Sequence, residues 1–251
     1  MNMLITTALV ALALPLQAAN TITIKGSDTM VILDQRWAES YMAKNDGVSI
    51  QVTGGGSGTG ISALINGGTD ICAASRTMKQ QEKLKLRERF NTQGVEIPVA
   101  RDGLAVYLNE TTPVKELSLE QISDIYRGKI TNWKDVGGND AKIILYSREN
   151  NSGTYVYFKD NVLMGKDFSP MAQNMPGTAA VVNAISKDPK GIGYGGAAYA
   201  KGIKFASVKK TVKDTAYEPT MENIKSGKYP ISRFLYFYVR SKPSGEIKKF
   251  V

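Results

Sequence analysis

The sequence predicts an α/β protein, because short alternating strands, polar turns and helical patterns follow one another in the same order several times. The chain has 251 residues, of which 42% are apolar, so it can bury a substantial core in one or two domains. Each Ser-, Thr- and Gly-containing turn comes directly after a strand, and ligands of open α/β sheets bind at such strand ends.

The first strand–turn–helix unit begins near the N-terminus. Residues 21–25 alternate like a strand, and the turn that follows contains Ser27, Asp28 and Thr29. Apolar residues then recur at helical spacing from Met30 to Tyr41.

Two further units repeat this order. The second alternates over residues 48–52 and continues into a Gly-rich turn, residues 54–60, which contains Ser57 and precedes a short helical pattern. In the third, a short apolar run ends at Ser75-Arg76 before the charged stretch Lys79–Phe90, which we expect to be a solvated helix. Because turns of this kind lie at the carboxyl ends of strands, we predict that they converge on one small anion.

The most informative local motif is Ser152-Gly153-Thr154, which follows Arg148 and enters an amphipathic stretch. A helix that begins there would point unpaired backbone N–H groups outward, toward an anion. The two hydroxyls and the guanidinium add donors suited to a tetrahedral oxyanion such as phosphate. The alternative is an ordinary helix N-cap without a ligand.

Two long β-rich segments, Ile97–Leu108 and Pro230–Arg240, predict crossovers between two lobes. Between them we expect a second lobe with a helix opened by a capping box at Ser118, a strand at residues 142–146 and a helix at residues 179–185.

The composition excludes several kinds of enzyme. The chain has no histidine and a single cysteine, so Ser-His-Asp, Cys-His, histidine-metal and multi-thiolate sites are impossible. That cysteine, Cys72, lies in an apolar run and is expected to be buried. The Gly-rich turn lacks the Lys of a P-loop, and the Ser-x-x-Lys match at 207–210 lies in a strand-like run. We therefore expect no catalysis, no metal and no cofactor.

The formal net charge is +9, which attracts anions in general. The basic residues are scattered, and no basic stripe interleaved with aromatic residues occurs. Nucleic acid is therefore not the expected partner.

Residues 1–19 have the pattern of a secretory signal. An uncharged stretch, Leu4–Leu16, precedes the small-residue cleavage site Gln17-Ala18-Ala19, although no Lys or Arg comes before it. The alternative is a transmembrane anchor, but the apolar run is short for a membrane span. We expect a cleaved signal and a soluble periplasmic protein.

From about Thr21 onward the chain closely resembles the phosphate-binding proteins of bacterial phosphate ABC transporters, a branch of the two-domain periplasmic solute-binding family. Besides the turns above, the matching segments are Ile125–Trp133 with Val136–Gly138, Gly191–Tyr194 and Leu235–Val239. The resemblance implies a two-lobe periplasmic binding protein fold, in which each lobe is a mixed β-sheet flanked by helices and two crossover strands form the hinge.

The resemblance also implies lobe boundaries. We expect lobe 1 at residues 20–99 and 232–251, lobe 2 at residues 100–231, and phosphate in the cleft between them. Relatives continue beyond the Pro-Ser-Gly-Glu helix start with a full C-terminal helix, so we expect this helix of lobe 1 to be truncated here.

The phosphate ligands of the family correspond to hydroxyls, helix-start amides and an arginine of this chain. The matching positions are Ser27, Thr29, Ser57, Arg148, Ser152, Gly153 and Thr154.

One matched position departs from the best-known family pattern. An Asp that accepts the proton of hydrogen phosphate, and so discriminates against sulfate, is replaced by Arg76 in an ungapped alignment. We therefore expect Arg76, beside Ser75, to donate to the anion, and Asp28 to be the proton acceptor, with Asp70 in reserve. The alternative for Asp28 is a cap of the helix that begins near Met30.

The predicted function is high-affinity binding of inorganic phosphate and its delivery, by a monomer, to the membrane permease of an ABC transporter. The alternatives are a binder of another tetrahedral oxyanion such as sulfate, a phosphate-sensing or scavenging protein and, less favoured, a phosphatase-like enzyme.

Overall fold

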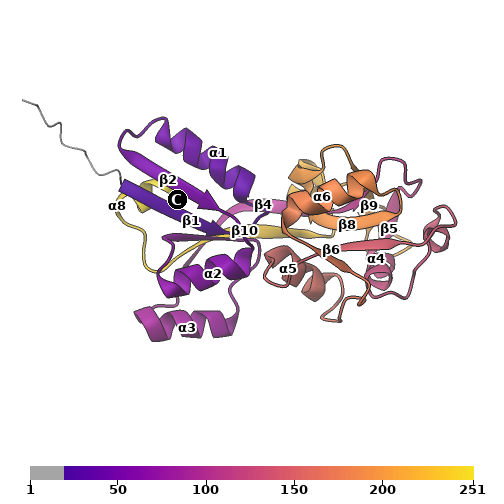
Figure 1. Ribbon diagram of the computed structural model, residues 1–251, viewed down its shortest axis with the longest axis horizontal. Coiled ribbons are helices and arrows are strands. Elements are labelled where there is room, and N and C mark those ends of the chain that lie inside the picture. Colours follow the sequence, from indigo (N-terminus) through magenta and orange to yellow (C-terminus); the bar gives the residue numbers. More distant parts are fainter. Residues whose placement is uncertain (1–19) are drawn as a thin grey trace, which may run out of the picture.

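The computed structural model describes residues 20–251, which form two lobes joined by two long strands (Figure 1). The predicted α/β fold with two crossover strands is confirmed. The predicted signal at residues 1–19 lies outside the described residues. Within residues 20–251, no helix has the length and apolar character needed to cross a membrane.

The first lobe is built on three parallel strands in the order β2-β1-β3, with bounds β1 Asn20–Gly26, β2 Val48–Thr53 and β3 Ile71–Ala74. Its helices are α1 (Val31–Met42) on one face of the sheet and α2 (Ser57–Asn66) and α3 (Gln80–Phe90) on the other (Figure 1). The short helix α8 (Gly245–Phe250) packs on the α1 side, where the rings of Phe250 and Tyr41 meet edge to face.

Helix α2 begins earlier than the sequence indicates. Its first residue is Ser57, inside the turn expected at residues 54–60, because Gly54–Gly56 complete the turn alone. Gly56 has φ 89°, a conformation that glycine adopts without steric cost. Ser57 therefore lies at the start of a helix.

Two antiparallel strands, β4 (Val95–Leu108) and β10 (Ser232–Val239), form the hinge. β10 also pairs with β3 of the first lobe, whereas the second half of β4 pairs with β8 and β9 of the second lobe. The sheet order is consequently β2-β1-β3-β10-β4-β8-β6-β7, so that one sheet continues through both lobes.

The second lobe contains the remaining strands and helices. The strands are β5 (Glu116–Ser118), β6 (Ile144–Arg148), β7 (Gln173–Met175), β8 (Gly191–Gly196) and β9 (Lys204–Lys209). The helices are α4 (Leu119–Tyr126), α5 (Gly153–Asn161), α6 (Gly177–Lys187) and α7 (Met221–Lys225), with 3-10 helices η1 (Trp133–Val136) and η2 (Ala197–Tyr199). The capping box predicted at Ser118 is confirmed, because Ser118 Oγ accepts a hydrogen bond from Gln121 N at 3.1 Å and Gln121 Oε1 accepts one from Ser118 N at 2.9 Å.

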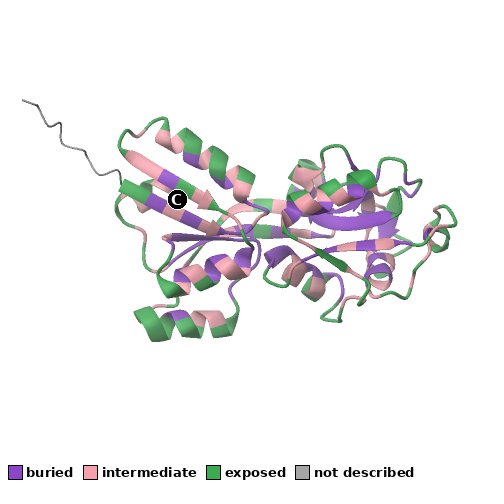
Figure 2. Ribbon diagram, in the orientation of Figure 1, coloured by how far each residue is buried: buried purple, intermediate pink, exposed green. Residues whose placement is uncertain are grey.

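Each lobe has its own buried core (Figure 2). In β4, residues up to Ala100 pack into a core of the first lobe, and residues from Leu104 onward pack into the cores of the second. The predicted lobe boundaries at residues 99/100 and 231/232 remain a proposal, and this division places the change of core between Ala100 and Leu104 on β4. Cys72 is buried in the first lobe, as predicted, and burial raises the pKa of its thiol.

Candidate anion-binding site

Three serine hydroxyls of the first lobe meet at the carboxyl edge of its parallel strands. Ser27 follows β1, Ser75 follows β3, and Ser57 opens the helix after β2. Ser27 Oγ donates to Ser75 Oγ at 2.9 Å, and Ser57 Oγ lies 3.3 Å from Ser75 Oγ. All three residues are buried. The convergence follows from the parallel pairing, which brings successive strand ends to the same edge.

The start of α5 in the second lobe lies directly against these serines. Ser152 caps the helix, since its Oγ accepts hydrogen bonds from the N–H groups of Thr154 and Tyr155 at 3.2 and 3.3 Å. A Cβ added to Gly153 would collide with the Oγ atoms of Ser57 and Ser75. Glycine at this position therefore allows the positive end of the α5 dipole to approach the serine cluster.

Two threonines join the lobes beside the serines. Thr29 Oγ1 of the first lobe lies 3.0 Å from Thr154 Oγ1 of the second, and both residues are buried. The lobes are thus closed on one another in this structure, with hydroxyl groups from both sides in one cluster.

Arg148 ends β6 and is only 1% exposed. Its Nη2 donates to Asp28 Oδ2 at 2.7 Å, and its Nη1 donates to Thr178 Oγ1 at 2.8 Å. Its buried Nε has no hydrogen-bond partner among residues 20–251. A buried donor without an acceptor is costly, so this nitrogen can donate to an anion bound beside it.

Asp28 bridges the two lobes. Its Oδ2 pairs with Arg148, and its Oδ1 accepts a hydrogen bond from the N–H group of Gly55 at 2.8 Å. The alternative interpretation of Asp28 as a helix cap is wrong, because α1 is capped at Met30 without a side-chain hydrogen bond. The reserve acceptor, Asp70, accepts hydrogen bonds from Thr23. Asp70 precedes the first residue of β3, whereas Ser75 follows its last residue, so the two lie at opposite ends of this strand.

Arg76 pairs with Glu82 and not with the serine hydroxyls. Its Nη2 and Nη1 donate to Glu82 Oε1 and Oε2 at 2.7 and 2.8 Å. Burial acts to raise the pKa of Glu82, but the hydrogen bonds from Arg76 and from the N–H group of Lys79, together with the charges of these residues, outweigh it and hold the pKa below its ordinary value. Only Nε of Arg76 lacks a partner among the described residues.

Several interlobe contacts were missed by sequence reasoning. Asn151 O accepts a hydrogen bond from the N–H group of Gly58 at 2.9 Å, and Asn151 Nδ2 donates to Gly55 O and Thr59 Oγ1 at 2.9 and 3.1 Å. Tyr199 donates from its hydroxyl to Asp28 O at 2.5 Å. Asn151 directly precedes the Ser-Gly-Thr motif, and this place in the sequence is the signal that could have indicated its role between the lobes.

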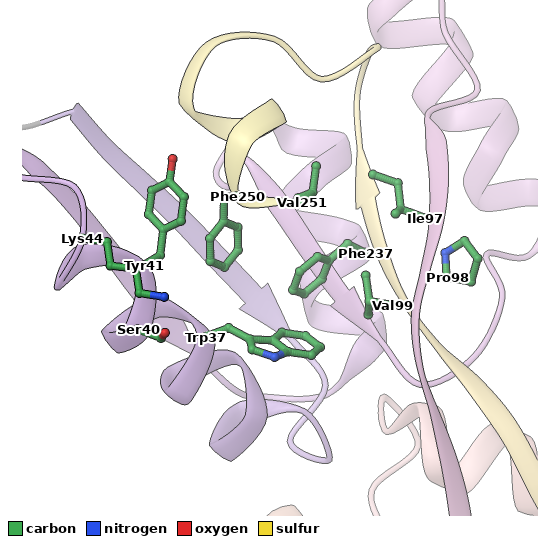
Figure 3. Close-up of a pocket in the computed structure, with 10 residues that line it drawn as sticks. All are labelled: Trp37, Ser40, Tyr41, Lys44, Ile97, Pro98, Val99, Phe237, Phe250 and Val251. Carbon is green, nitrogen blue, oxygen red and sulfur yellow. The ribbon is translucent and has the colours of Figure 1, made fainter. Parts of the chain in front are cut away.

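Two larger hollows are present among residues 20–251, and the first of them adjoins the cluster at Ser75. One, of about 450 Å³, lies between α5, β10 and the segment before α3, and its lining includes Ser75, Arg76 and Arg233. The other, of about 460 Å³, is an apolar groove between α1, α8 and the hinge strands, lined by Trp37 and Phe237 among others (Figure 3). Within residues 20–251, no group of three or more His, Cys, Asp or Glu side chains could hold a metal ion.

Known proteins share this architecture. A family model described as a PBP superfamily domain matches residues 15–251. A phosphate-binding protein PstS from Pseudomonas aeruginosa is 34% identical over 232 residues, which cover 87% of this chain and 72% of the relative. A PstS from Staphylococcus haemolyticus is 33% identical over 224 residues, which cover 87% of this chain and 70% of the relative.

Solved structures of phosphate transport proteins have a similar fold. A protein from Clostridium perfringens, described as a phosphate ABC transporter substrate-binding protein and solved with bound phosphate, superposes with a TM-score of 0.83 at 32% identity, over 92% of this chain and 91% of the other. An ABC-type phosphate transport receptor from Vibrio cholerae gives a TM-score of 0.70 at 32% identity, over 91% and 90%.

Two lobes that close over buried hydroxyls and an arginine define a solute-binding protein of the two-lobe type. The chain belongs to the PBP superfamily and, within it, to the family of the PstS phosphate-binding proteins. The resemblance inferred from the sequence is thereby confirmed.

Proposed function

We propose that this protein binds inorganic phosphate between its closed lobes and delivers it to the permease of a phosphate ABC transporter. The observation that carries the proposal is the interlobe cluster of buried hydroxyls beside Arg148, whose Nε has no partner among residues 20–251. The names of the PstS relatives and the phosphate-bound Clostridium perfringens structure support phosphate as the ligand.

The proposed ligand groups come from both lobes. Hydroxyls and amides at Ser27, Thr29, Ser57 and Ser75 would bind from the first lobe, and Arg148 with Ser152, Gly153 and Thr154 from the second. Because this set is complete only when the lobes are closed, phosphate stabilises the closed form. At a hundredfold excess over the dissociation constant, the gain in stability is about 2.7 kcal/mol.

Asp28 is the proposed acceptor for the proton of hydrogen phosphate. A carboxylate oxygen can accept more than one hydrogen bond, so the bonds from Arg148 and Gly55 leave capacity for the ligand. Sulfate has no proton to offer and would leave that acceptor unsatisfied. Arg76 remains a predicted ligand with one donor to contribute, since Glu82 holds its two terminal nitrogens.

The setting of the protein is also a proposal. We infer that residues 1–19 are a signal and that the mature chain works in the periplasm as a monomer, without nucleic acid. The PstS relatives support a role beside a membrane transporter. A sensing or scavenging role would use the same site.

A non-catalytic role is favoured because the proposed site offers no activated nucleophile. The chain contains no histidine to act as a general base. Ser57 Oγ accepts from the N–H group of Ser75 and lies beside another serine hydroxyl. The Ser-x-x-Lys match at residues 207–210 lies at the end of β9, away from the cluster.

Calorimetric titration of the extensively dialysed protein with phosphate and with sulfate tests the proposal. We expect saturable binding of one phosphate per chain and much weaker binding of sulfate. Tighter binding of sulfate would favour the alternative oxyanion, and steady turnover of a chromogenic phosphate ester would favour an enzyme.

A further inference from the structure

Arg233 lies where the hinge meets the proposed phosphate site. It stands on β10 directly opposite Asp102 of β4. Its Nε and Nη2 donate to Asp102 Oδ2 at 3.1 and 2.9 Å, and the two side chains are 3% and 10% exposed. The pair therefore fixes the guanidinium to both hinge strands.

The same Nη2 reaches both lobes. It donates to Thr154 Oγ1 at 2.9 Å and lies 3.5 Å from Thr29 Oγ1, so the guanidinium lies behind the threonine pair that joins the lobes. The ring of Tyr157 packs against the guanidinium with its centroid at 5.4 Å. Arg233 Nη1 is buried without a hydrogen-bond partner among residues 20–251.

The hydrogens of this group can be counted. An arginine only donates, whereas a threonine hydroxyl donates one hydrogen and accepts through two lone pairs. Thr154 must therefore act as an acceptor toward Arg233. One of the two threonine hydrogens serves the bond between the hydroxyls, and the other is left to be donated to an acceptor in the cluster.

We propose that Arg233 is a positioning residue of the phosphate site, which directs the one free hydroxyl hydrogen of the Thr29–Thr154 pair toward the ligand and links binding to the hinge. This inference rests on the proposed function. When the lobes separate, Arg233 cannot keep contact with both threonines, because one belongs to each lobe. Closure and the orientation of this donor are thus coupled.

The test compares Arg233→Gln with Arg101→Gln. Arg101 is a neighbouring hinge arginine that is exposed, stacks on Phe234 and donates to Lys225 O, so its replacement removes the same charge without touching the threonines.

Phosphate affinity is measured by calorimetry, and the melting temperature is measured with and without phosphate. We expect Arg233→Gln to weaken phosphate binding about tenfold to a hundredfold, the range for a hydrogen bond to a charged group. Arg101→Gln should leave the affinity unchanged.

A double-mutant cycle with Thr154→Val separates positioning from a purely structural role. If Arg233 acts through the threonine pair, Arg233→Gln should weaken binding far less in the Thr154→Val background than in the wild type. If the losses of phosphate affinity in the two single variants simply add in the double variant, the inference is overturned. It is also overturned if Arg233→Gln lowers the melting temperature equally with and without phosphate while its phosphate affinity is unchanged. If Arg233→Gln does not fold, the double variant Asp102→Asn/Arg233→Gln is measured in its place. The double variant also removes the carboxylate that Arg233→Gln leaves without its partner.

The same experiment distinguishes the two levels of proposal. A wild-type protein that does not bind phosphate overturns the proposed function and this inference together. A wild type that binds phosphate, with an Arg233→Gln variant of the same affinity, overturns this inference alone.

Discussion

Asp28 and Arg148 form an ion pair of 2.7 Å between the two lobes, although they are 120 positions apart in the sequence. The pair neutralises a guanidinium that is almost fully buried, and Arg148 Nε is left without a partner among residues 20–251. One partner belongs to each lobe, so the pair exists only in the closed form and contributes both to closure and to the anion site.

Replacing Arg148 tests the cationic part of the site. We expect Arg148→Ala to weaken phosphate binding by about 2–5 kcal/mol, because it removes a buried charged donor and leaves Asp28 unpaired. Arg89→Ala is the matched control, since Arg89 lies on the exposed face of α3. Calorimetry measures the phosphate affinity of both variants. Equal losses of affinity would show that the general positive charge of the protein, and not this site, attracts the anion.

Gly153→Ala tests whether the lobes close as described. The added Cβ would collide with the hydroxyls of Ser57 and Ser75, and overpacking of this kind costs about 1–3 kcal/mol. We expect phosphate binding to weaken about tenfold or more, while the ligand-free protein keeps its stability because alanine favours the helix. Gly68→Ala is the control, because its Cβ would meet only Ala63 O at 3.8 Å. Unchanged affinity in Gly153→Ala would contradict the closed arrangement.

Asp28→Asn tests the discrimination between phosphate and sulfate. The amide keeps the shape but can donate as well as accept, so phosphate should weaken relative to sulfate by about tenfold or more. Competition between the two anions measures the ratio, with Asp70→Asn as the control at the far end of β3. A ratio that stays constant in Asp28→Asn and collapses in Asp70→Asn would transfer the acceptor role to Asp70.

Asp34 gives a prediction about pH. This buried residue of α1 lies outside the anion cluster, and burial raises the pKa of its carboxyl to about 8 from the ordinary 3.8. The native state therefore holds the proton more tightly than the unfolded state, so the stabilising contribution is complete below pH 3.8 and is lost as the pH rises through about 8.

Urea unfolding at pH 5 and pH 9 measures this effect. We expect the wild type to lose, between these values, on the order of a few kcal/mol more of its free energy of unfolding than Asp34→Asn loses. Asp46→Asn, which changes an exposed carboxyl, should behave like the wild type. Parallel pH profiles of wild type and Asp34→Asn would contradict a buried proton at Asp34.

The sequence predicts much of the site because its main determinants are local. Ser27, Ser57 and Ser75 follow successive strands, and parallel pairing of those strands is enough to bring them together. Ser152 caps α5 in the way that its spacing to Thr154 and Tyr155 indicates. These relationships depend on patterns within a few residues, which a single sequence contains.

The remaining contacts depend on competition and on distant pairing. Arg76 could donate to an anion, but Glu82 at the start of α3 lies within reach and holds its terminal nitrogens. The Arg233–Asp102 pair depends on the register of two strands that are far apart in the sequence. No local pattern specifies that register, so the arginine behind the threonine pair could not be identified in advance.

A crystal structure of the dialysed protein reloaded with phosphate tests the central claim most directly. We predict one phosphate between the lobes, within hydrogen-bond distance of Arg148, the Ser57 hydroxyl and the Thr154 hydroxyl, with a phosphate oxygen facing Asp28. A phosphate bound only in the hollow beside Arg76 and Lys79, with the interlobe cluster unchanged, would contradict it.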